Sequence, residues 1–323
     1  ITGQVPLATP KNTMLEITLA DLIVTDDDDP YPTGFTLTVL TGTNYTLVDH
    51  TITPSLDFIG TLIVPVKVND GLVDSNIFNL SVNVTNLRTL PITNIYGQTV
   101  TLQAYFSPEI SNITINFTLN GAVACSGITN NNGRAICNAT LLVDYGTFPT
   151  GVRADFSGNA NYPASIATAQ LIVLRRNLNV NATGVNREYD GTTNAEVTLS
   201  DNRVPGDNLT VTYDSAIFTE NGNVGTAKPV SVSGISITGP DSGNYNLQNT
   251  TATTTADIYA KTITVTANSG QYKLFGFADP VFTYTYSPND PPVAFSGLLS
   301  RDMGEDIGQY NITQGSLSAG PNY

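Results

Sequence analysis

The amino-acid sequence predicts an all-β protein made of several β-sandwich modules. Composition is the first observation: only 12% of the 323 residues are charged, and helix-favouring residues never recur at a helical spacing. The second is a period-two alternation of apolar and polar residues that recurs from one end of the chain to the other. Turn signals at intervals of roughly 8–12 residues are the third, and they favour sandwiches over parallel α/β sheets.

The alternation predicts the strands in order along the chain. Four clear segments, each with an apolar residue at every second position, are residues 35–39, 62–68, 78–84 and 113–119. Such a pattern is typical of a strand with one face buried and the other in water. Near the end of the chain, Phe282, Tyr284 and Tyr286 alternate with threonines, so we expect these rings to point into the core.

Length and connectors predict four modules. A chain of 323 residues exceeds what one hydrophobic core organises. The alternation lapses into short polar or basic connectors at residues 85–88, 175–177 and 258–261. The predicted modules are residues 1–86, 87–175, 176–259 and 260–323. Because the connectors contain no Gly/Ser-rich tract, we expect a linear, elongated array with semi-fixed module orientations.

The charge balance limits the partners. A formal net charge of -14 opposes nucleic acid and anionic membranes, since binding a polyanion needs clustered lysine and arginine. The sequence contains no apolar run of the roughly 18 residues that span a bilayer, so we expect no direct membrane insertion. Neighbouring domains or subunits of the same protein are the expected partners, with a surface glycan or protein receptor as a further possibility.

The two cysteines predict a disulfide. Cys125 and Cys137 flank an Asn/Gly cluster at residues 130–133, which is a strong signal for a hairpin turn. A turn centred on Asn131 places the two thiols opposite each other across the hairpin, at a separation that a disulfide tolerates. Two free buried thiols are the alternative. A disulfide implies an oxidising, extracellular setting.

An acidic cluster is a candidate calcium site. Its residues are Asp26, Asp27, Asp28, Asp29, Asp70 and Asp74. In an immunoglobulin-like sandwich the two loops that carry them share one end of the module. Clustered carboxylates repel one another unless a cation neutralises them, and hard oxygen ligands favour Ca²⁺. A solvated acidic loop is the alternative, and a melting temperature that ignores both calcium and chelator would support it.

No catalytic constellation is visible. The glutamates are scattered over different modules, so no glycosidase-like pair of carboxylates stands out. The sequence has one histidine and no nucleophile-elbow serine motif to accompany it. We therefore expect no enzymatic activity, and no cofactor apart from the calcium ion considered above.

Motifs in the first half of the chain resemble two bacterial repeats. Residues 1–86 resemble a cadherin-like repeat through Leu19-Ala20-Asp21-Leu22, Asp57-Phe58-Ile59-Gly60-Thr61 and Val68-Asn69-Asp70-Gly71. Residues 88–175 resemble a bacterial immunoglobulin-like repeat through Tyr96-Gly97-Gln98-Thr99-Val100-Thr101-Leu102, Asn132-Gly133 and Phe156-Ser157-Gly158-Asn159-Ala160-Asn161-Tyr162. The family pattern usually has an acidic residue where Asn159 stands, so the resemblance implies no metal there.

The second half resembles two further repeats. Residues 176–259 are similar to the YDG repeat through Tyr189-Asp190-Gly191-Thr192-Thr193, Asp201-Asn202-Arg203-Val204 and Gly243-Asn244-Tyr245. Residues 260–323 resemble the MBG repeat through Lys261-Thr262-Ile263-Thr264-Val265, Gly276-Phe277-Ala278-Asp279-Pro280 and Gly308-Gln309-Tyr310-Asn311-Ile312. In that family the pair Asn322-Tyr323 opens a further strand, so we expect the last module to lack its final strand.

These resemblances together imply an extracellular scaffold. All four families occur in bacterial surface adhesins built from tandem repeats, which implies a stalk region of a large surface adhesin or matrix protein, at the cell surface or secreted. One alternative is a self-assembling extracellular filament subunit, completed by a strand from a neighbour. A non-catalytic accessory region of a secreted enzyme is another.

Overall fold

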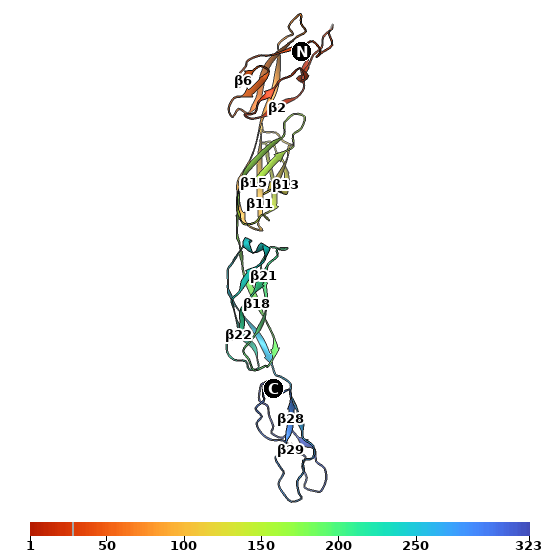
Figure 1. Ribbon diagram of the computed structural model, residues 1–323, viewed down its shortest axis with the longest axis vertical. Helices are drawn as coiled ribbons and strands as arrows, with labels where there is room; N and C mark the ends of the chain where they lie inside the picture. Colours follow the sequence, from red (N-terminus) through yellow and green to blue (C-terminus); the bar gives the residue numbers. More distant parts are fainter. Residues whose placement is uncertain (28) are drawn as a thin grey trace. The chain divides into compact units, whose positions relative to one another are not determined.

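The computed structural model describes residues 1–27 and 29–323, and it confirms the all-β expectation (Figure 1). Its tertiary contacts divide the chain into two compact units, Ile1–Arg176 and Asn177–Tyr323. Within the described residues, the helices are two short 3₁₀ turns, η1 (Leu19–Asp21) and η2 (Pro240–Asn244). All other regular structure is β-strand.

The first strands of unit 1 form two packed sheets. They are β1 (Gly3–Gln4), β2 (Leu7–Pro10), β3 (Leu15–Glu16), β4 (Leu22–Ile23), β5 (Thr36–Val39), β6 (Tyr45–Val48), β7 (Thr51–Pro54), β8 (Gly60–Asn69) and β9 (Phe78–Thr89). One packed sheet contains β5, β8, β9 and β2, the other has the order β3-β7-β6, and β1 pairs with β4 apart from both. The core between them includes Ile17, Ile52, Leu62 and Leu80, all almost completely buried. The alternation in residues 62–68 and 78–84 therefore marks inward-facing positions, as expected.

Strand β9 crosses the expected connector at residues 85–88 without interruption. Its first part pairs with β8, and its last residues pair with β11 (Thr99–Ser107). The buried positions shift by one residue at this point: Val84 and Thr85 are both buried, and Leu87 and Thr89 follow in the new phase. Residues 85–88 are therefore part of a strand and not a separate connector, and the buried face changes where the pairing passes from β8 to β11. A module boundary at this position stays a prediction.

The remaining strands of unit 1 form one further sheet and extend the sheet that contains β9. They are β10 (Ile92–Ile95), β12 (Thr114–Leu119), β13 (Ala122–Ile128), β14 (Arg134–Thr140), β15 (Gly146–Phe156) and β16 (Ser165–Leu174). One sheet has the order β10-β16-β15-β12-β13, and β14 joins β11 in the sheet that contains β9. Aromatic packing marks the core, where the Phe106 ring contacts Phe156 and Tyr162 edge to face.

Unit 2 begins with strands that form several small sheets. They are β17 (Arg176–Leu178), β18 (Val180–Val185), β19 (Arg187–Glu188), β20 (Glu196–Asp201), β21 (Thr210–Thr212), β22 (Ser215–Phe218), β23 (Gly225–Ser233), β24 (Ser236–Thr238), β25 (Tyr245–Leu247) and β26 (Thr251–Tyr259). The largest sheet has the order β19-β26-β23-β22. Its buried side chains include Phe218, Val232 and Ile258.

The last part of unit 2 has short strands and little burial. The strands are β27 (Thr264–Ala267), β28 (Tyr284–Ser287), β29 (Ser300–Arg301) and β30 (Ile312–Thr313). Within residues 260–323, all of which the structure describes, Leu317 is the one fully buried apolar side chain. Tyr284 and Tyr286 are half-buried and pack edge to face on Phe295, as the alternation predicts.

A parallel pairing of an early strand with a late strand occurs three times. In unit 1, β2 runs parallel to β9 and β10 runs parallel to β16. In unit 2, β19 runs parallel to β26. The residue after each early strand donates its N–H to the late strand: Lys11 to Thr85, Tyr96 to Leu174 and Tyr189 to Tyr259, at 2.8, 2.9 and 2.9 Å. The three pairs therefore share one register.

Candidate functional site

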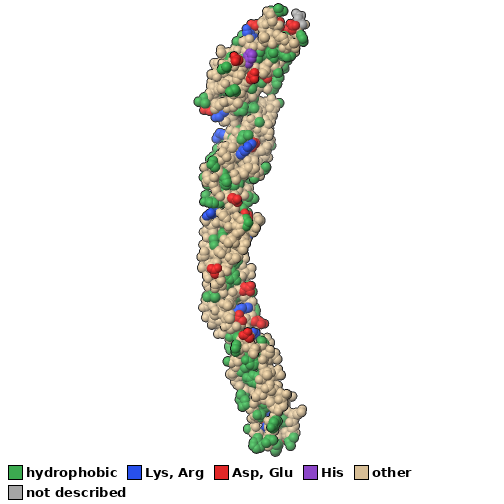
Figure 2. Space-filling view, in the orientation of Figure 1, with side chains coloured by type: hydrophobic (Ala, Val, Ile, Leu, Met, Phe, Trp, Pro, Cys, Tyr) green, Lys and Arg blue, Asp and Glu red, His purple; other side chains and the backbone are tan. Residues whose placement is uncertain are grey.

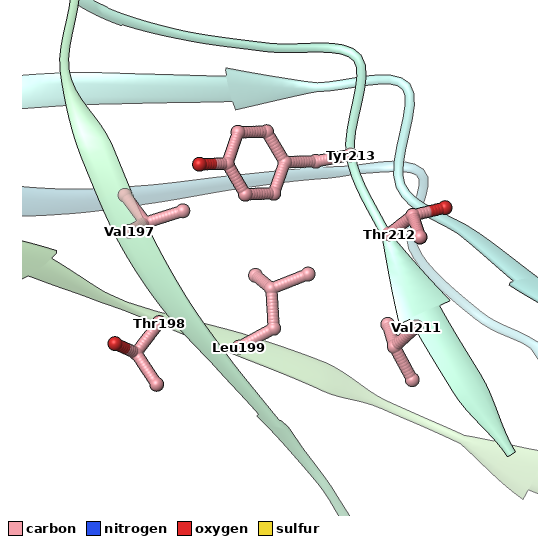
Figure 3. Close-up of a pocket in the computed structure, with 6 residues that line it drawn as sticks. All are labelled: Val197, Thr198, Leu199, Val211, Thr212 and Tyr213. Carbon is pink, nitrogen blue, oxygen red and sulfur yellow. The ribbon is translucent and has the colours of Figure 1, made fainter.

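A shallow cavity of about 420 Å³ lies between β20 and β21 (Figure 3). Val197, Leu199, Val211 and Tyr213 line it, together with threonine side chains. Its residues include no carboxylate, imidazole or thiol, so it holds no group that transfers a proton near neutral pH or attacks a substrate. The cavity is an open gap between two small sheets, and we assign no catalytic or binding role to it.

A larger cavity, of about 720 Å³, lies between two loops of the last part of unit 2. Residues 270–282 supply one side and residues 301–312 the other. The lysine and the arginine in this cavity are each shared between two acidic residues. Lys273 lies 2.6 Å from Glu305 and 3.3 Å from Asp279, and Arg301 lies 2.8 Å from each of the same two carboxylates. The network joins the two loops and carries no net charge.

The ion pairs keep both carboxylates ionised. A hydrogen bond from Lys273 is the main cause that lowers the pKa of Glu305, and one from Arg301 does the same for Asp279. A carboxylic acid that acts as a general acid near neutral pH needs a raised pKa instead. The network therefore fastens the two loops together rather than providing acid-base catalysis.

Apolar side chains are exposed around this network (Figure 2). We define the apolar loop surface as Tyr272, Leu274, Phe275, Phe277, Val281, Met303 and Ile307. The Tyr272 ring is 80% exposed. Exposed apolar groups gathered in this way are typical of interaction surfaces. The sequence feature that indicates this surface is the group of three aromatic residues in 272–277, a segment without period-two alternation.

The YDG-like motif residues hold turns in place. Arg203 binds Asp201 through both carboxylate oxygens, at 2.8 and 2.5 Å, and donates a further hydrogen bond to the Leu209 carbonyl. The Val204 N–H donates to the Tyr245 hydroxyl, which donates to Asp207. Two motif segments that lie far apart in sequence are thus tied together. Their polar groups are engaged within the fold.

The Tyr189-Asp190-Gly191 motif behaves in the same way. Asp190 accepts hydrogen bonds from the N–H and the hydroxyl of Thr192, and it forms an ion pair with Arg187 at 2.5 Å. Gly191 has a φ of +80°, in the left-handed region that favours glycine. The motif is therefore a turn with its own side-chain cap.

Acidification should weaken the ion pair between Asp201 and Arg203. The hydrogen bond from Arg203 lowers the pKa of Asp201 below its ordinary value of 3.8, and the Asp201 side chain is only 5% exposed. A lowered pKa means that the stabilisation is present above the unfolded-state pKa and is lost as pH falls through the folded-state value. We expect hydrogen exchange of residues 196–212 to accelerate below about pH 4.

Two variants test this pH dependence. Asp201→Asn should accelerate exchange at neutral pH and remove the acid-dependent step. The matched control is Asp155→Asn, because Arg153 and Asp155 form a pair at the same spacing on an exposed surface. Its effect should be smaller, since solvent screens exposed pairs. If exchange of residues 196–212 accelerates equally at low pH in the wild type and in Asp201→Asn, protonation of Asp201 is not the cause of the acid-dependent step.

The structure places the predicted calcium ligands as follows. Asp70 accepts hydrogen bonds from the backbone of Leu72 and Val73, and these bonds lower its pKa. Asp74 forms an ion pair with Lys67, and the hydrogen bond from that lysine lowers the pKa of Asp74. Both carboxylates are thus engaged by the protein itself.

The acidic loop is described in part. Asp26 accepts a hydrogen bond from the Asp29 N–H at 3.0 Å, and Asp27 is exposed. Asp28 lies outside the described residues. Among residues 1–27 and 29–323, no group of three or more His, Cys, Asp or Glu side chains is placed to hold a metal ion. Calcium binding by Asp26, Asp27, Asp28, Asp29, Asp70 and Asp74 stays a prediction.

The disulfide forms between Cys125 and Cys137, with their Cα atoms 6.1 Å apart. The expected turn is present: Gly133 has a φ of +65°, and the Asn130 side chain accepts hydrogen bonds from the backbone of Asn132 and Arg134. The strands on either side do not form a ladder, however. β13 belongs to the sheet with β12, and β14 to the sheet with β11, so the bond links the two layers at their edges.

Comparison with protein families assigns the second half of the chain. Residues 174–256 match the YDG domain, and residues 263–323 match the MBG domain of the YGX type. A comparison with curated proteins found no match. For the first half, the cadherin-like and bacterial immunoglobulin-like resemblances stay predictions. Among the described residues, no helix is both long and apolar enough to cross a membrane.

Several solved structures are similar to this chain over part of its length. The titin domains z1z2 in complex with telethonin cover 54% of this chain and 94% of their own, at 13% identity and a TM-score of 0.24. Fibronectin(III)-like modules of Clostridium thermocellum CbhA cover 53% and 91%, at 10% identity and a TM-score of 0.21. Bacteroides ovatus SGBP-B in complex with a mixed-linkage heptasaccharide covers 86% and 72%, at 18% identity and a TM-score of 0.20.

These TM-scores are low, so we base no argument on them. The two family matches agree in position with the YDG-like and MBG-like motifs of the sequence, and neither family is catalytic. The second half of the chain therefore consists of a YDG domain followed by an MBG domain of the YGX type.

Proposed function

We propose that this chain is a load-bearing part of an extracellular structural and adhesive scaffold, a stalk region of a large surface adhesin or matrix protein. The YDG and MBG domains support the scaffold class. The disulfide between Cys125 and Cys137 supports an oxidising, extracellular setting. The polar motif residues support it too, because their side chains hold turns together within the fold.

The parallel pairing of early and late strands carries the proposal. A load on the chain pulls on the N-terminal end of β10 and the C-terminal end of β16. Because the two strands run side by side in the same direction, these ends lie at opposite ends of the ladder. The force therefore acts along the ladder, and its hydrogen bonds must break together rather than one after another. The β2–β9 and β19–β26 pairs give the same geometry. Repeated shear-loaded ladders are what a stalk under tension needs.

Single-molecule stretching of the full chain tests the load-bearing function. The Tyr96 N–H donates a hydrogen bond to the Leu174 carbonyl. Because backbone groups alternate in direction along a strand, the N–H and C=O of Asn94, two residues earlier, also face β16, whereas those of Thr93 face away from it. Asn94→Pro removes one ladder hydrogen bond and should lower the force of one unfolding step. Thr93→Pro is the matched control and should leave that force nearly unchanged, because proline is tolerated where the N–H points away from the sheet.

A third variant separates the ladder from the side chain. The Asn94 amide also contacts the backbone of Ile95 and Thr99, and Asn94→Ala removes only those contacts. We expect Asn94→Ala to unfold at a higher force than Asn94→Pro. If Asn94→Pro and Thr93→Pro unfold at the same force, the β10–β16 ladder bears no load, and the proposed function loses its support.

A further inference from the structure

A buried lysine lies at an inward-facing position of β23. Among the residues that the structure describes, Lys228 is the only buried lysine or arginine, and its side chain is 8% exposed. Val230 and Val232 follow it at every second position, and both valines are buried. An ammonium group at such a position is costly, because it loses its hydration there. The groups around the Lys228 Nζ atom decide how this cost is offset.

Two side chains from the loop between β22 and β23 approach this amine. The Lys228 Nζ donates a hydrogen bond to the Asn221 Oδ1 at 3.0 Å, and a carboxylate oxygen of Glu220 lies 3.8 Å from Nζ. Because a C=O bond is about 1.23 Å long, the carboxamide carbon of Asn221 lies at most about 4.2 Å from Nζ. A nucleophile, an electrophilic carbon and a proton acceptor are thus gathered in one place.

The backbone of this segment holds Asn221 and Lys228 in place. The Asn223 N–H donates to the same Asn221 Oδ1 at 3.0 Å, which polarises the carboxamide and would stabilise negative charge on this oxygen. The register between β23 and β26 shifts between Gly225 and Lys228, as in a β-bulge. A Cβ atom at Gly225 would lie 3.2 Å from the Lys228 Cδ, so the lysine stem passes close to this glycine. The missing side chain leaves room for the stem to turn back toward Asn221.

From this geometry we propose that Lys228 and Asn221 become joined by an intramolecular amide bond. Glu220 accepts a proton from the lysine, and the amine attacks the Asn221 carboxamide carbon. A bond forms between Nζ and Cγ, and the negative charge of the intermediate lies on Oδ1 beside the Asn223 N–H. The bond between Cγ and Nδ2 then breaks. Nζ gives up two protons in all: Glu220 passes one to Nδ2, so that ammonia leaves, and the second is released to solvent water.

The reaction removes the charge from the buried position. An amide nitrogen is neutral, so β23 no longer buries an ammonium group. The Glu220 side chain is 61% exposed and Asn221 is exposed too, so the carboxylate stays hydrated and ammonia leaves directly into solvent. The new bond closes residues 221–228 into a covalent ring at the start of β23. The inference goes beyond the load-bearing function and does not rest on it, because the bond is detected by mass and not by force.

The mass of the intact full chain tests the proposal. The wild type should be lighter by one ammonia molecule than the mass calculated for the disulfide-bonded chain. Fragmentation of the proteolytic peptide that contains both residues should give no sequence ions between Asn221 and Lys228, because the ring holds this stretch together. A cyclic imide formed by Asn221 and Gly222 loses the same ammonia but still gives these ions. A wild-type mass equal to the calculated one, or the presence of these ions, would overturn the proposal.

Substitution of either partner should restore the calculated mass. Lys228→Met keeps an unbranched apolar stem at the buried position, and slow hydrogen exchange in β26 shows that the domain remains folded. Asn221→Ala removes the carboxamide. The matched control is Asn132→Ala, because Asn132 also precedes a glycine in a turn between two strands, and this variant should keep the loss of ammonia. A loss of ammonia that persists in Lys228→Met would overturn the proposal.

A further variant tests the proton transfer. Glu220→Gln keeps the size of the side chain but removes the proton acceptor, so the bond should form roughly a hundredfold more slowly. Intact mass at increasing times after synthesis measures the fraction of joined protein. Glu220→Asp keeps a carboxylate and should recover part of the rate, and Glu196→Gln, an exposed position in β20, is the control that should leave the rate unchanged. Equal rates in the wild type and Glu220→Gln would overturn the role of Glu220 as proton acceptor.

Discussion

Phe106→Ala should lower the free energy of unfolding of unit 1 by about 3–5 kcal/mol, the largest effect we expect from a single substitution. The Phe106 ring is almost completely buried and contacts Phe156 and Tyr162. The substitution removes the buried ring and both aromatic contacts, and it leaves a cavity that rigid sheets fill only in part. Phe106 also lies opposite Leu87 of β9, so the loss falls on the strand that joins both halves of unit 1.

Hydrogen exchange measured with and without denaturant localises the effect. We expect faster exchange in β9, β11 and β15, and no change in β23 and β26 of unit 2. The control is Val123→Ala, also in unit 1, where the side chain is 89% exposed and its loss should change stability by less than about 0.5 kcal/mol. Comparable effects of the two substitutions would show that Phe106 is not part of a packed core.

Removal of the disulfide should lower the stability of unit 1 by about 3 kcal/mol. Cys125 and Cys137 are separated by 12 residues in sequence, and the bond restricts the unfolded chain over that loop. The bond also joins the edges of two different sheets, β13 in one layer and β14 in the other. Its loss should therefore let the layers separate at this edge. Denaturant unfolding of the Cys125→Ala/Cys137→Ala double variant, compared with wild type, measures the effect.

A reductant serves as the control for this prediction. Dithiothreitol should destabilise the wild type to the level of the double variant and leave the double variant unchanged. Thiol titration of the denatured wild type without reductant should find no free thiol. Titration of both cysteines would contradict the disulfide, and with it one support for an extracellular setting.

The sequence predicted most of the strands because burial in a two-layer sandwich imposes a period of two. Segments 62–68, 78–84 and 113–119 alternate in the structure as they do in the sequence. The period of two is interrupted at residues 84–85, where β9 passes from its pairing with β8 to its pairing with β11 and its buried face changes. Such a change of phase resembles the end of a strand in the sequence, although β-branched threonine fits a strand well.

The candidate sites were predictable to different degrees. The disulfide follows from spacing and turn residues, which act over a short stretch of chain. Its position between two sheets does not, because the order of strands in a sheet depends on partners far away in sequence. The bond between Val204 and Tyr245 is another such case, since 41 residues separate the two. The apolar loop surface was missed because exposure of a ring depends on what packs over it.

Taken alone, the sequence determined the strand periodicity, the YDG and MBG motifs, and the cysteine pair. Each of these depends on residues that are neighbours in the chain, or on a period that the pleat of a strand imposes. Tertiary structure alone decided that β9 pairs with both β8 and β11 in one sheet, and that early strands run parallel to late ones. Strand pairing is set by contacts between distant segments, and alternation along one strand does not specify which neighbour will lie beside it.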